Sequence, residues 1–335
     1  MPASMHDVAQ LAGVSQRTVS NVVNEYVHVK PETRARVQKA IKQLKYRPNV
    51  AARNLRSGRS GLIALAVPEI AAPYFAELAD QIQQHAELHG MTLLIDQTGG
   101  TRERELAVLH GYSSAVIDGL ILSPVALTAA DLETHDQTIP TLLLGERIDP
   151  GPFLHLSVDN VAAARTAVEF LISSGRTNIA ALGVLPESNG LGPASRRLQG
   201  YTEAMQGAGL TTSQLQLPTA EWGRRAGYAA IRDALDRGTE IDAVFCFNDL
   251  LAIGAIRALT DRGISIPARV ALIGWDDIEE SRFTVPTLST ICPDKAFIAR
   301  TAVERLIARI AGNGPEEDEI IPEFQLIHRQ TTQSN

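Results

Sequence analysis

Cysteine is nearly absent from this 335-residue sequence. The two that occur, Cys246 and Cys292, stand in apolar, strand-like surroundings and belong to no metal-binding or redox motif. A disulfide framework needs several paired cysteines, so a chain with only two excludes a disulfide-stapled scaffold. We therefore predict two buried free thiols in a reducing compartment.

Long apolar runs are lacking as well. No stretch approaches the roughly 20 apolar residues that a membrane-spanning helix requires, and no apolar signal-peptide core follows the N-terminus. The hydrophobic fraction of 44% is ordinary for globular proteins. We expect a cytoplasmic protein without membrane contact, long enough for two or three domains.

Catalytic signatures are also missing. The chain contains neither a GxSxG nucleophile elbow nor a phosphate-binding P-loop. His85 and His89 stand four residues apart in HAELH, but the glutamate is misplaced for a zinc-protease motif and no third ligand is evident. Gly190 and Gly192 lack the third glycine of a dinucleotide fingerprint. We expect no enzyme activity, no metal and no cofactor.

Positive charge is concentrated at one end of the chain. Residues 1–60 contain eleven Lys and Arg and three Asp and Glu, a net charge of +8. The other 275 residues contain 20 basic and 35 acidic side chains, a net charge of −15. A basic head on an acidic body predicts that only the head meets a polyanion such as DNA.

The stretch from Asp7 to Asn24 has the pattern of two short helices around a tight turn. Ser4 and Asp7 have the spacing of a capping box, Gly13 predicts a left-handed helix end, and Ser15 can cap the second helix. Apolar residues at helical spacing predict the two inner faces. These residues are Val8, Ala9, Leu11 and Ala12 on the first helix and Val19, Val22 and Val23 on the second.

The outer face of the second helix carries Gln, Arg and Asn near its N-terminal end, which suits reading of the DNA major groove. An ordinary helical hairpin with a solvated polar face has the same pattern. The following basic segment favours DNA binding. It contains a helix expected from Pro31 to about Lys45 and the short, helix-prone VAARNLRSG after Pro48.

Together these segments resemble the N-terminus of the lactose-repressor (LacI/GalR) family of bacterial transcription regulators. The likeness rests on VAQLAGVSQRTVSNVVN and on PETRARVQKAIKQLKYRPNVAARNLRSGRSGLIALAVP, and it continues to the C-terminal LIHRQTT. It implies a helix-turn-helix DNA-binding domain at 1–46, a hinge helix or linker at 47–60, and an effector-binding and dimerisation core at 61–335.

The resemblance also implies how the head meets DNA. The hinge helix orders on the operator, Leu55 wedges into the central minor-groove step, and Arg53 and Arg56 lie near phosphates. A small head with a short hinge helix favours a homodimer on a near-palindromic operator. The implied DNA-binding residues are Ser15, Gln16, Arg17, Thr18, Ser20, Asn21, Asn24, Asn49, Ala52, Arg53, Leu55 and Arg56.

Beyond residue 61, apolar strands alternate with amphipathic helices. Unbroken apolar strands in this alternation imply parallel sheets covered on both faces. We predict an α/β fold with an N-terminal helix-turn-helix headpiece and two doubly wound parallel-sheet subdomains, similar to periplasmic binding proteins. The first lobe is expected at about 61–157 and 291–320, and the second at about 158–290 and 321–332.

Ligands of doubly wound sheets bind beyond the carboxyl ends of the strands. Residues at such ends are candidates, and the resemblance adds effector contacts at Arg197, Trp222, Asn248 and Asp276. A core role fits Tyr74 and Phe75 equally well. Asp249 is expected to cap the helix after its strand. The full set of ligand-binding candidates is Tyr74, Phe75, Ser123, Glu146, Arg147, Arg197, Trp222, Asn248 and Asp276.

These features predict a sequence-specific DNA-binding repressor whose operator affinity is controlled by a small ligand between two lobes. Carboxylate, amide, guanidinium and indole groups suit a sugar or sugar derivative, while a nucleoside or purine is also compatible. Whether the ligand releases or strengthens DNA binding is left open. The alternatives are a solute-binding protein, disfavoured by the basic head, and a nucleotide-dependent enzyme, disfavoured by the missing phosphate motifs.

Overall fold

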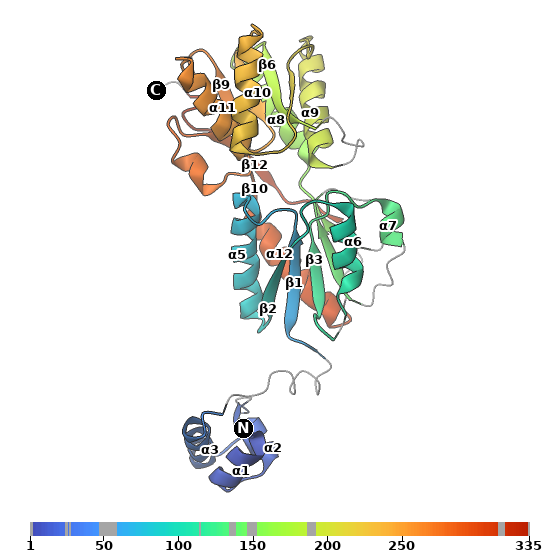
Figure 1. Cartoon of the computed structure of the whole chain (residues 1–335), viewed down its shortest axis with the longest axis vertical. Helices are drawn as coiled ribbons and strands as arrows, with labels where there is room; N and C mark the ends of the chain where they lie inside the picture. The colour runs from blue at the N-terminus through green and yellow to red at the C-terminus, as the bar shows by residue number, and fades with distance from the viewer. Residues whose placement is uncertain are drawn as a thin grey trace. The chain divides into compact units, whose positions relative to one another are not determined.

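The computed structural model describes residues 3–23, 26, 28–46, 59–113, 115–133, 139–145, 153–185, 192–313 and 319–333. The chain falls into two compact units, residues 1–60 and 61–335 (Figure 1). None of the helices within the described ranges combines the length and apolarity that a bilayer crossing needs.

The first unit is a bundle of three helices, α1 (Met5–Ala12), α2 (Gln16–Val23) and α3 (Pro31–Gln43). The predicted capping box is confirmed, because Ser4 Oγ accepts the Asp7 N–H at 3.3 Å and Asp7 Oδ2 accepts the Ser4 N–H at 2.8 Å. Gly13 ends α1 in the left-handed region with φ of 62°. The Oγ of Ser15 accepts the Thr18 N–H at 3.1 Å and so satisfies a free donor in the first turn of α2.

The core of this unit is small and apolar. Val8, Val19 and Val37 from the three helices are fully buried in it. Leu11 was predicted to share the inner face of α1, and this prediction is wrong, since 47% of Leu11 is exposed. The helix has only eight residues, and Val8, Ala9 and Ala12 already fill the face toward the core.

The first lobe of the second unit is built on a six-stranded sheet in the order β11-β5-β4-β3-β1-β2, with parallel pairing throughout. Its strands are β1 (Leu62–Val67), β2 (Thr92–Gln97), β3 (Gly119–Leu122), β4 (Thr141–Leu144), β5 (Leu154–Leu156) and β11 (Glu319–Ile320). Helices α5 (Pro73–Leu88) and α12 (Lys295–Ile310) pack together on one face. Helices α6 (Arg102–Gly111) and α7 (Ala129–Glu133) cover the other (Figure 1).

The second lobe has a six-stranded sheet in the order β12-β10-β9-β8-β6-β7. Its strands are β6 (Ile179–Val184), β7 (Gln216–Pro218), β8 (Ala243–Cys246), β9 (Ala271–Trp275), β10 (Ser289–Pro293) and β12 (Phe324–Ile327). Its helices are α8 (Asn160–Ser173), α9 (Pro193–Gly207), α10 (Arg224–Asp236), α11 (Asp249–Asp261) and the short 3-10 helix η1 (Glu279–Arg282). Helix α8 packs against α9, and α10 packs against α11.

The predicted fold class is confirmed, with one departure: β12 runs antiparallel to β10. In the described chain, each of three connections passes from one lobe to the other: from β5 to α8, from β10 to α12 and from β11 to β12. Strand β10 stays in the second sheet to Pro293, close to the expected return to the first lobe at about 291.

The two cysteines are free thiols. Cys246 on β8 is fully buried, as predicted. Cys292 on β10 is only partly buried, because this strand lies where the chain leaves the second lobe.

Candidate functional site

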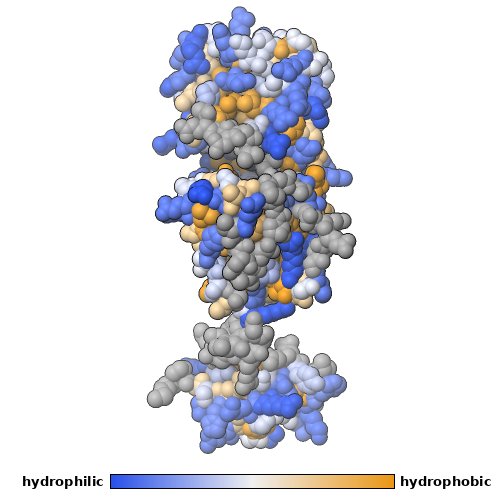
Figure 2. Space-filling view, turned by 90° about the vertical axis from the view of Figure 1, so that its right-hand side faces the viewer, coloured by the Kyte–Doolittle hydropathy of each residue, from blue (hydrophilic) through white to orange (hydrophobic). Residues whose placement is uncertain are grey.

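The outer face of α2 presents the polar side chains that the sequence singled out. Gln16 and Arg17 are exposed, and Ser20 and Asn21 are partly exposed. Gln16 Nε2 lies 3.2 Å from the ring nitrogen Nδ1 of His6, which holds its amide beside α1. Figure 2 shows hydrophilic side chains over much of the visible described surface of this unit. Other predicted DNA contacts lie outside the described residues, namely Asn24, Asn49, Ala52, Arg53, Leu55 and Arg56.

In the second unit, the carboxyl ends of strands from both lobes surround a cavity of about 270 Å³. Seven of the nine predicted ligand-binding residues line it. They are Tyr74, Phe75, Ser123, Arg197, Trp222, Asn248 and Asp276. The remaining two, Glu146 and Arg147, lie outside the described residues. Ligands of doubly wound folds bind at such strand ends, which is why strand-end position predicted Ser123, Asn248 and Asp276. The resemblance to the family supplied Arg197 and Trp222.

Arg197 of α9 is the charged centre of the cavity wall. Its side chain is 7% exposed, and its Nε donates to Asn160 Oδ1 at 2.7 Å. Its guanidinium carbon lies 3.9 Å from the ring centroid of Trp275 and 5.2 Å from that of Trp222. Cation–π attraction of this kind is strongest where water is excluded, so the two indoles hold the guanidinium in place.

Trp222 and Asn248 form the adjoining wall. The Trp222 indole N–H donates to Gly183 O at 2.8 Å, and its ring packs edge-on against Phe247. The Asn248 amide donates to Trp222 O at 3.1 Å, and its Oδ1 accepts the Leu251 N–H at 2.9 Å. These bonds fix both side chains before any ligand arrives, which reduces the entropy cost of binding.

Asp276 provides the acidic group of the cavity. Burial raises the pKa of its carboxyl to about 8, and the Arg197 guanidinium opposes that rise. Within the described part of the chain, no group donates a hydrogen bond to this carboxyl. Burial also raises the pKa of the nearby Tyr74 hydroxyl, which therefore stays protonated as a donor. The cavity thus combines an acceptor, donors and aromatic faces.

Sequence reasoning missed Asn160 and Trp275, which line the same cavity. Asn160 is the first residue of α8, directly after the chain leaves the first lobe. Because Asn160 begins a helix and does not follow the end of a strand directly, the rule that predicted the other contacts did not select it. Trp275 ends β9, and its proximity to the predicted Asp276 was the available signal.

A second feature missed by sequence reasoning is the support of the cavity wall at 123–128. The fully buried Glu105 of α6 accepts backbone N–H groups from Val125, Ala126 and Leu127 at 2.9 to 3.0 Å. Three such bonds satisfy a loop that would otherwise bury free donors. This carboxylate therefore fixes the wall on which Ser123 and Val125 meet the cavity.

The predicted capping role of Asp249 is wrong. Asn248 caps α11, while the fully buried Asp249 carboxylate accepts from Ser281 Oγ and Thr290 Oγ1 at 2.7 Å each and from the Ile278 N–H at 3.0 Å. A side chain at Gly274 would put its Cβ 2.1 Å from Asp249 Oδ1. The carboxylate thus needs a glycine on β9 and ties three segments of the second lobe together.

Asp249→Asn is expected to change how stability depends on pH. Burial raises the pKa of the Asp249 carboxyl from 3.8 to about 7, so the folded protein holds a proton that the unfolded chain has lost. The free energy of unfolding should therefore fall by up to about 1.4 kcal/mol per pH unit between the two pKa values and level off above them. Denaturant titrations at pH 5, 6, 7 and 8 should show a shallower fall for the variant, and parallel profiles would contradict the assignment.

The described residues contain no group of three or more His, Cys, Asp or Glu side chains placed to hold a metal ion. What they do contain is a basic helix-turn-helix unit and, in the second unit, two doubly wound lobes around a polar cavity. Together these features define a DNA-binding protein with a ligand-binding core.

Comparison with known proteins agrees with this class. Residues 4–49 match the family model for bacterial regulatory proteins of the lacI family, and residues 168–332 match that for a periplasmic binding protein-like domain. The transcriptional regulator GalS of Salmonella typhimurium is 34% identical over 311 residues, which cover 92% of this chain and 90% of GalS. The transcriptional repressor PurR of Erwinia tasmaniensis is 32% identical over 98% of this chain and 96% of its own length.

Among solved structures, the lac repressor dimer bound to operator and the anti-inducer ONPF superposes with a TM-score of 0.87 at 28% identity, over the whole of both chains. This chain belongs to the LacI family of bacterial regulatory proteins, and it is a DNA-binding transcriptional regulator. The three relatives are named as regulators of transcription and not as enzymes.

Proposed function

We propose that this regulator is a repressor whose operator affinity is controlled by a small polyhydroxylated ligand, a monosaccharide or a close derivative, bound between the two lobes. The observation that carries the proposal is the meeting of Arg197, Trp222, Asn248 and Asp276 around one cavity. These residues come from separate strand ends and helices of the second lobe, and Tyr74 and Phe75 of the first lobe face them.

The chemistry of the cavity supports a polyol. Ligand hydroxyls that donate to the Asp276 carboxyl lower its pKa, and the resulting carboxylate accepts hydrogen bonds from two neighbouring hydroxyls. Amide and guanidinium groups donate to ring and hydroxyl oxygens. The Trp222 indole offers an apolar face to a sugar ring. Ligand pockets span roughly 300 to 1,000 Å³. A cavity of about 270 Å³, just below that range, fits a ligand as small as a monosaccharide.

For DNA binding, we assign base reading to the outer face of α2 and minor-groove insertion to Leu55. The relatives PurR and lac repressor are named as repressors, and the solved lac repressor is a dimer bound to its operator. We infer a homodimer on a near-palindromic operator for this chain, acting in the cytoplasm where the chromosome is. The ligand controls the operator affinity only if its own affinity differs between the DNA-bound and DNA-free arrangements.

Arg17→Ala tests the reading face. Arg at the start of a recognition helix reads guanine through two hydrogen bonds, and each good contact of this kind discriminates by about 1 to 3 kcal/mol. We expect the variant to lose preference at one base position of each half-site, measured by selection from randomised operator fragments. Equal weakening on every sequence would instead make Arg17 a phosphate contact.

The ligand class is tested by calorimetric titration of the full chain with D-galactose, D-ribose, glucose 6-phosphate, hypoxanthine and guanine. Saturable binding of a pentose or hexose supports the proposal. Binding of a purine alone would replace it, with Trp222, Tyr74 and Phe75 stacking on the base. Adding the bound compound to an operator complex then gives the sign of regulation, as release or as tighter binding.

A further inference from the structure

Residues 61–335 contain nineteen arginines and a single lysine, Lys295. This lysine is the first residue of α12, and only 10% of its side chain is exposed. Its Nζ donates to Glu77 Oε2 at 2.6 Å, to Asp276 O at 2.8 Å and to Asp277 O at 2.9 Å. An ammonium group has three N–H donors, so these contacts satisfy all three. They offset the cost of removing the charge from water.

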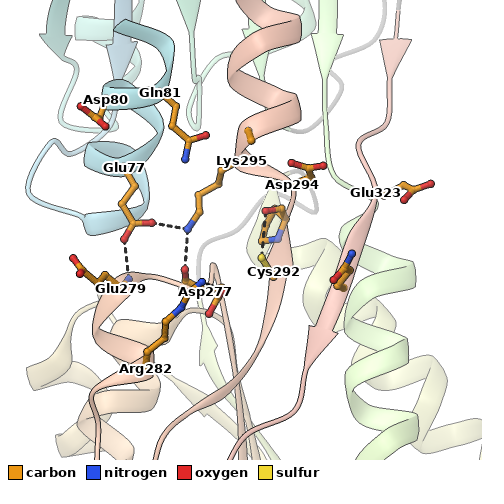
Figure 3. A pocket seen from close by; sticks show the side chains of 13 residues that line it. Glu77, Asp80, Gln81, Asp277, Glu279, Arg282, Cys292, Asp294, Lys295 and Glu323 are labelled. Carbon is orange, nitrogen blue, oxygen red and sulfur yellow. Dashed lines mark hydrogen bonds and ion pairs between the residues drawn. The ribbon is translucent and has the colours of Figure 1, made fainter. Parts of the chain in front are cut away.

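The partners of Lys295 belong to both lobes. Helix α12 packs against α5, which carries Glu77, so the ion pair itself lies in the first lobe. Asp276 and Asp277 follow β9 of the second lobe. The other oxygen of Glu77, Oε1, accepts the Glu279 backbone N–H at 2.8 Å. Two side chains of the first lobe thus hold segment 276–279 of the second lobe at three backbone groups. Figure 3 shows the bonds to Asp277 and Glu279.

The segment that they hold carries a wall of the ligand cavity. Asp276 lines the cavity, and its backbone has φ of 111°, while that of Asp277 has φ of 46°. Residues with a side chain adopt this left-handed region only where the surroundings compensate the cost. The side chain of Asp277 is also bound by Arg329 at 2.5 Å and by Arg282 at 3.2 Å. The strained backbone is therefore held by Lys295 through two carbonyls and by two arginines through the Asp277 side chain.

We propose that Glu77 and Lys295 form a positioning pair that sets the backbone of Asp276 for ligand binding and transmits occupancy of the cavity to the contact between the lobes. The inference rests on the proposed function of the cavity. A ligand that moves the Asp276 carboxylate shifts the attached carbonyl, and the ammonium that binds this carbonyl is fixed to α5 and α12. Ligand binding is thereby coupled energetically to the first lobe through the side chains of Glu77 and Lys295.

The geometry requires an ammonium and not merely a positive charge. One carboxylate oxygen and two carbonyl oxygens around a single nitrogen suit the three donors of a lysine, whereas the planar guanidinium of arginine directs its donors in a fixed fork. Lys295→Arg therefore should not restore the function that Lys295→Met loses. Arg300→Met is the matched control, because it removes an exposed positive charge from the same helix.

Hydrogen exchange of the ligand-free full chain tests the pair without any knowledge of the ligand. We expect the amides of 276–280 to exchange at least tenfold faster in Lys295→Met and in Glu77→Gln than in the wild type, with the Arg300→Met protein unchanged. The Glu279 amide, whose acceptor is Glu77, should respond in both variants. Unchanged exchange at these amides would overturn the proposal.

The coupling is tested with the compound from the calorimetric panel that binds the wild type. For each variant, operator affinity is measured without the compound and at saturation, and the ratio of the two affinities is compared. We expect the ratio to move at least fivefold toward one in Lys295→Met, Lys295→Arg and Glu77→Gln, and no further in the Lys295→Met/Glu77→Gln double variant, because the two residues act as one unit. A wild-type ratio in the variants overturns the proposal, whereas failure of the proposed function would appear as absent binding by the wild type itself.

Discussion

Asp276→Asn is expected to weaken binding of the effector by roughly 10- to 100-fold. A bound polyol donates hydrogen bonds to the Asp276 carboxyl and so favours its ionised form. The variant loses these charge-assisted hydrogen bonds, which contribute about 1.5 to 3 kcal/mol. A carboxylate accepts from two ligand hydroxyls, whereas an amide offers one acceptor oxygen and turns its donors toward the second hydroxyl. Because no described group donates a hydrogen bond to the Asp276 carboxyl, the substitution removes no such bond within the described chain. Calorimetric titration of the two proteins measures the change.

Asp159→Asn is the matched control for this substitution. Asp159 caps α8 by accepting the Ala162 N–H at 2.9 Å, and asparagine caps a helix about as well as aspartate. The control therefore removes one negative charge while leaving the cavity intact, and its effector affinity should equal that of the wild type. The operator affinity of the ligand-free Asp276→Asn protein should equal that of the ligand-free wild type. Equal effector affinity in wild type and Asp276→Asn would remove Asp276 from the ligand site.

Leu55→Ala should weaken operator binding by roughly 10- to 100-fold and leave effector affinity unchanged. We proposed, by resemblance to the family, that this leucine inserts between base pairs and kinks the duplex. Burial of a leucine side chain contributes about 1.5 to 3 kcal/mol. Gel-shift titration on an operator fragment measures the loss. Leu55→Ile is the rescue variant, since isoleucine also serves as a minor-groove wedge. Unchanged operator affinity in Leu55→Ala would contradict the wedge assignment.

The helix ends of the head could be predicted from residues that are close together in the sequence. The Ser4–Asp7 capping box, the left-handed Gly13 and the Ser15 cap follow from residue types at fixed spacings. Leu11 was misjudged because helical periodicity states which residues share a face, and not how wide the buried part of that face is. In a helix of two turns, the packing partners decide that width.

The cavity was predictable in part for a topological reason. Residues at the carboxyl ends of parallel strands meet at one edge of the sheet, which gathered Ser123, Asn248 and Asp276 without any long-range information. Asn160 and Lys295 stand instead at the first residues of helices that follow crossings between the lobes. Their contacts depend on which lobe each helix returns to, and a single sequence does not encode that choice locally.

Buried carboxylates limit sequence reasoning in a different way. Asp249 and Glu105 have the sequence signature of ordinary polar helix residues, yet both are fully buried and bind backbone or hydroxyl groups far along the chain. A carboxylate next to a helix start predicts a cap by frequency. Here the neighbouring Asn248 takes the cap, which leaves Asp249 to satisfy donors of the 278–290 region.

The most direct test of the account is capture of genomic DNA fragments by the purified full chain and by a form lacking residues 1–60, with sequencing of the bound fragments. We predict that the full chain, and not the shortened form, enriches a near-palindromic site, and that this enrichment changes when the sugar that binds the cavity is added. Capture of the same sites by the shortened form, or enrichment that no cavity-binding compound alters, would contradict ligand-controlled DNA binding through the headpiece.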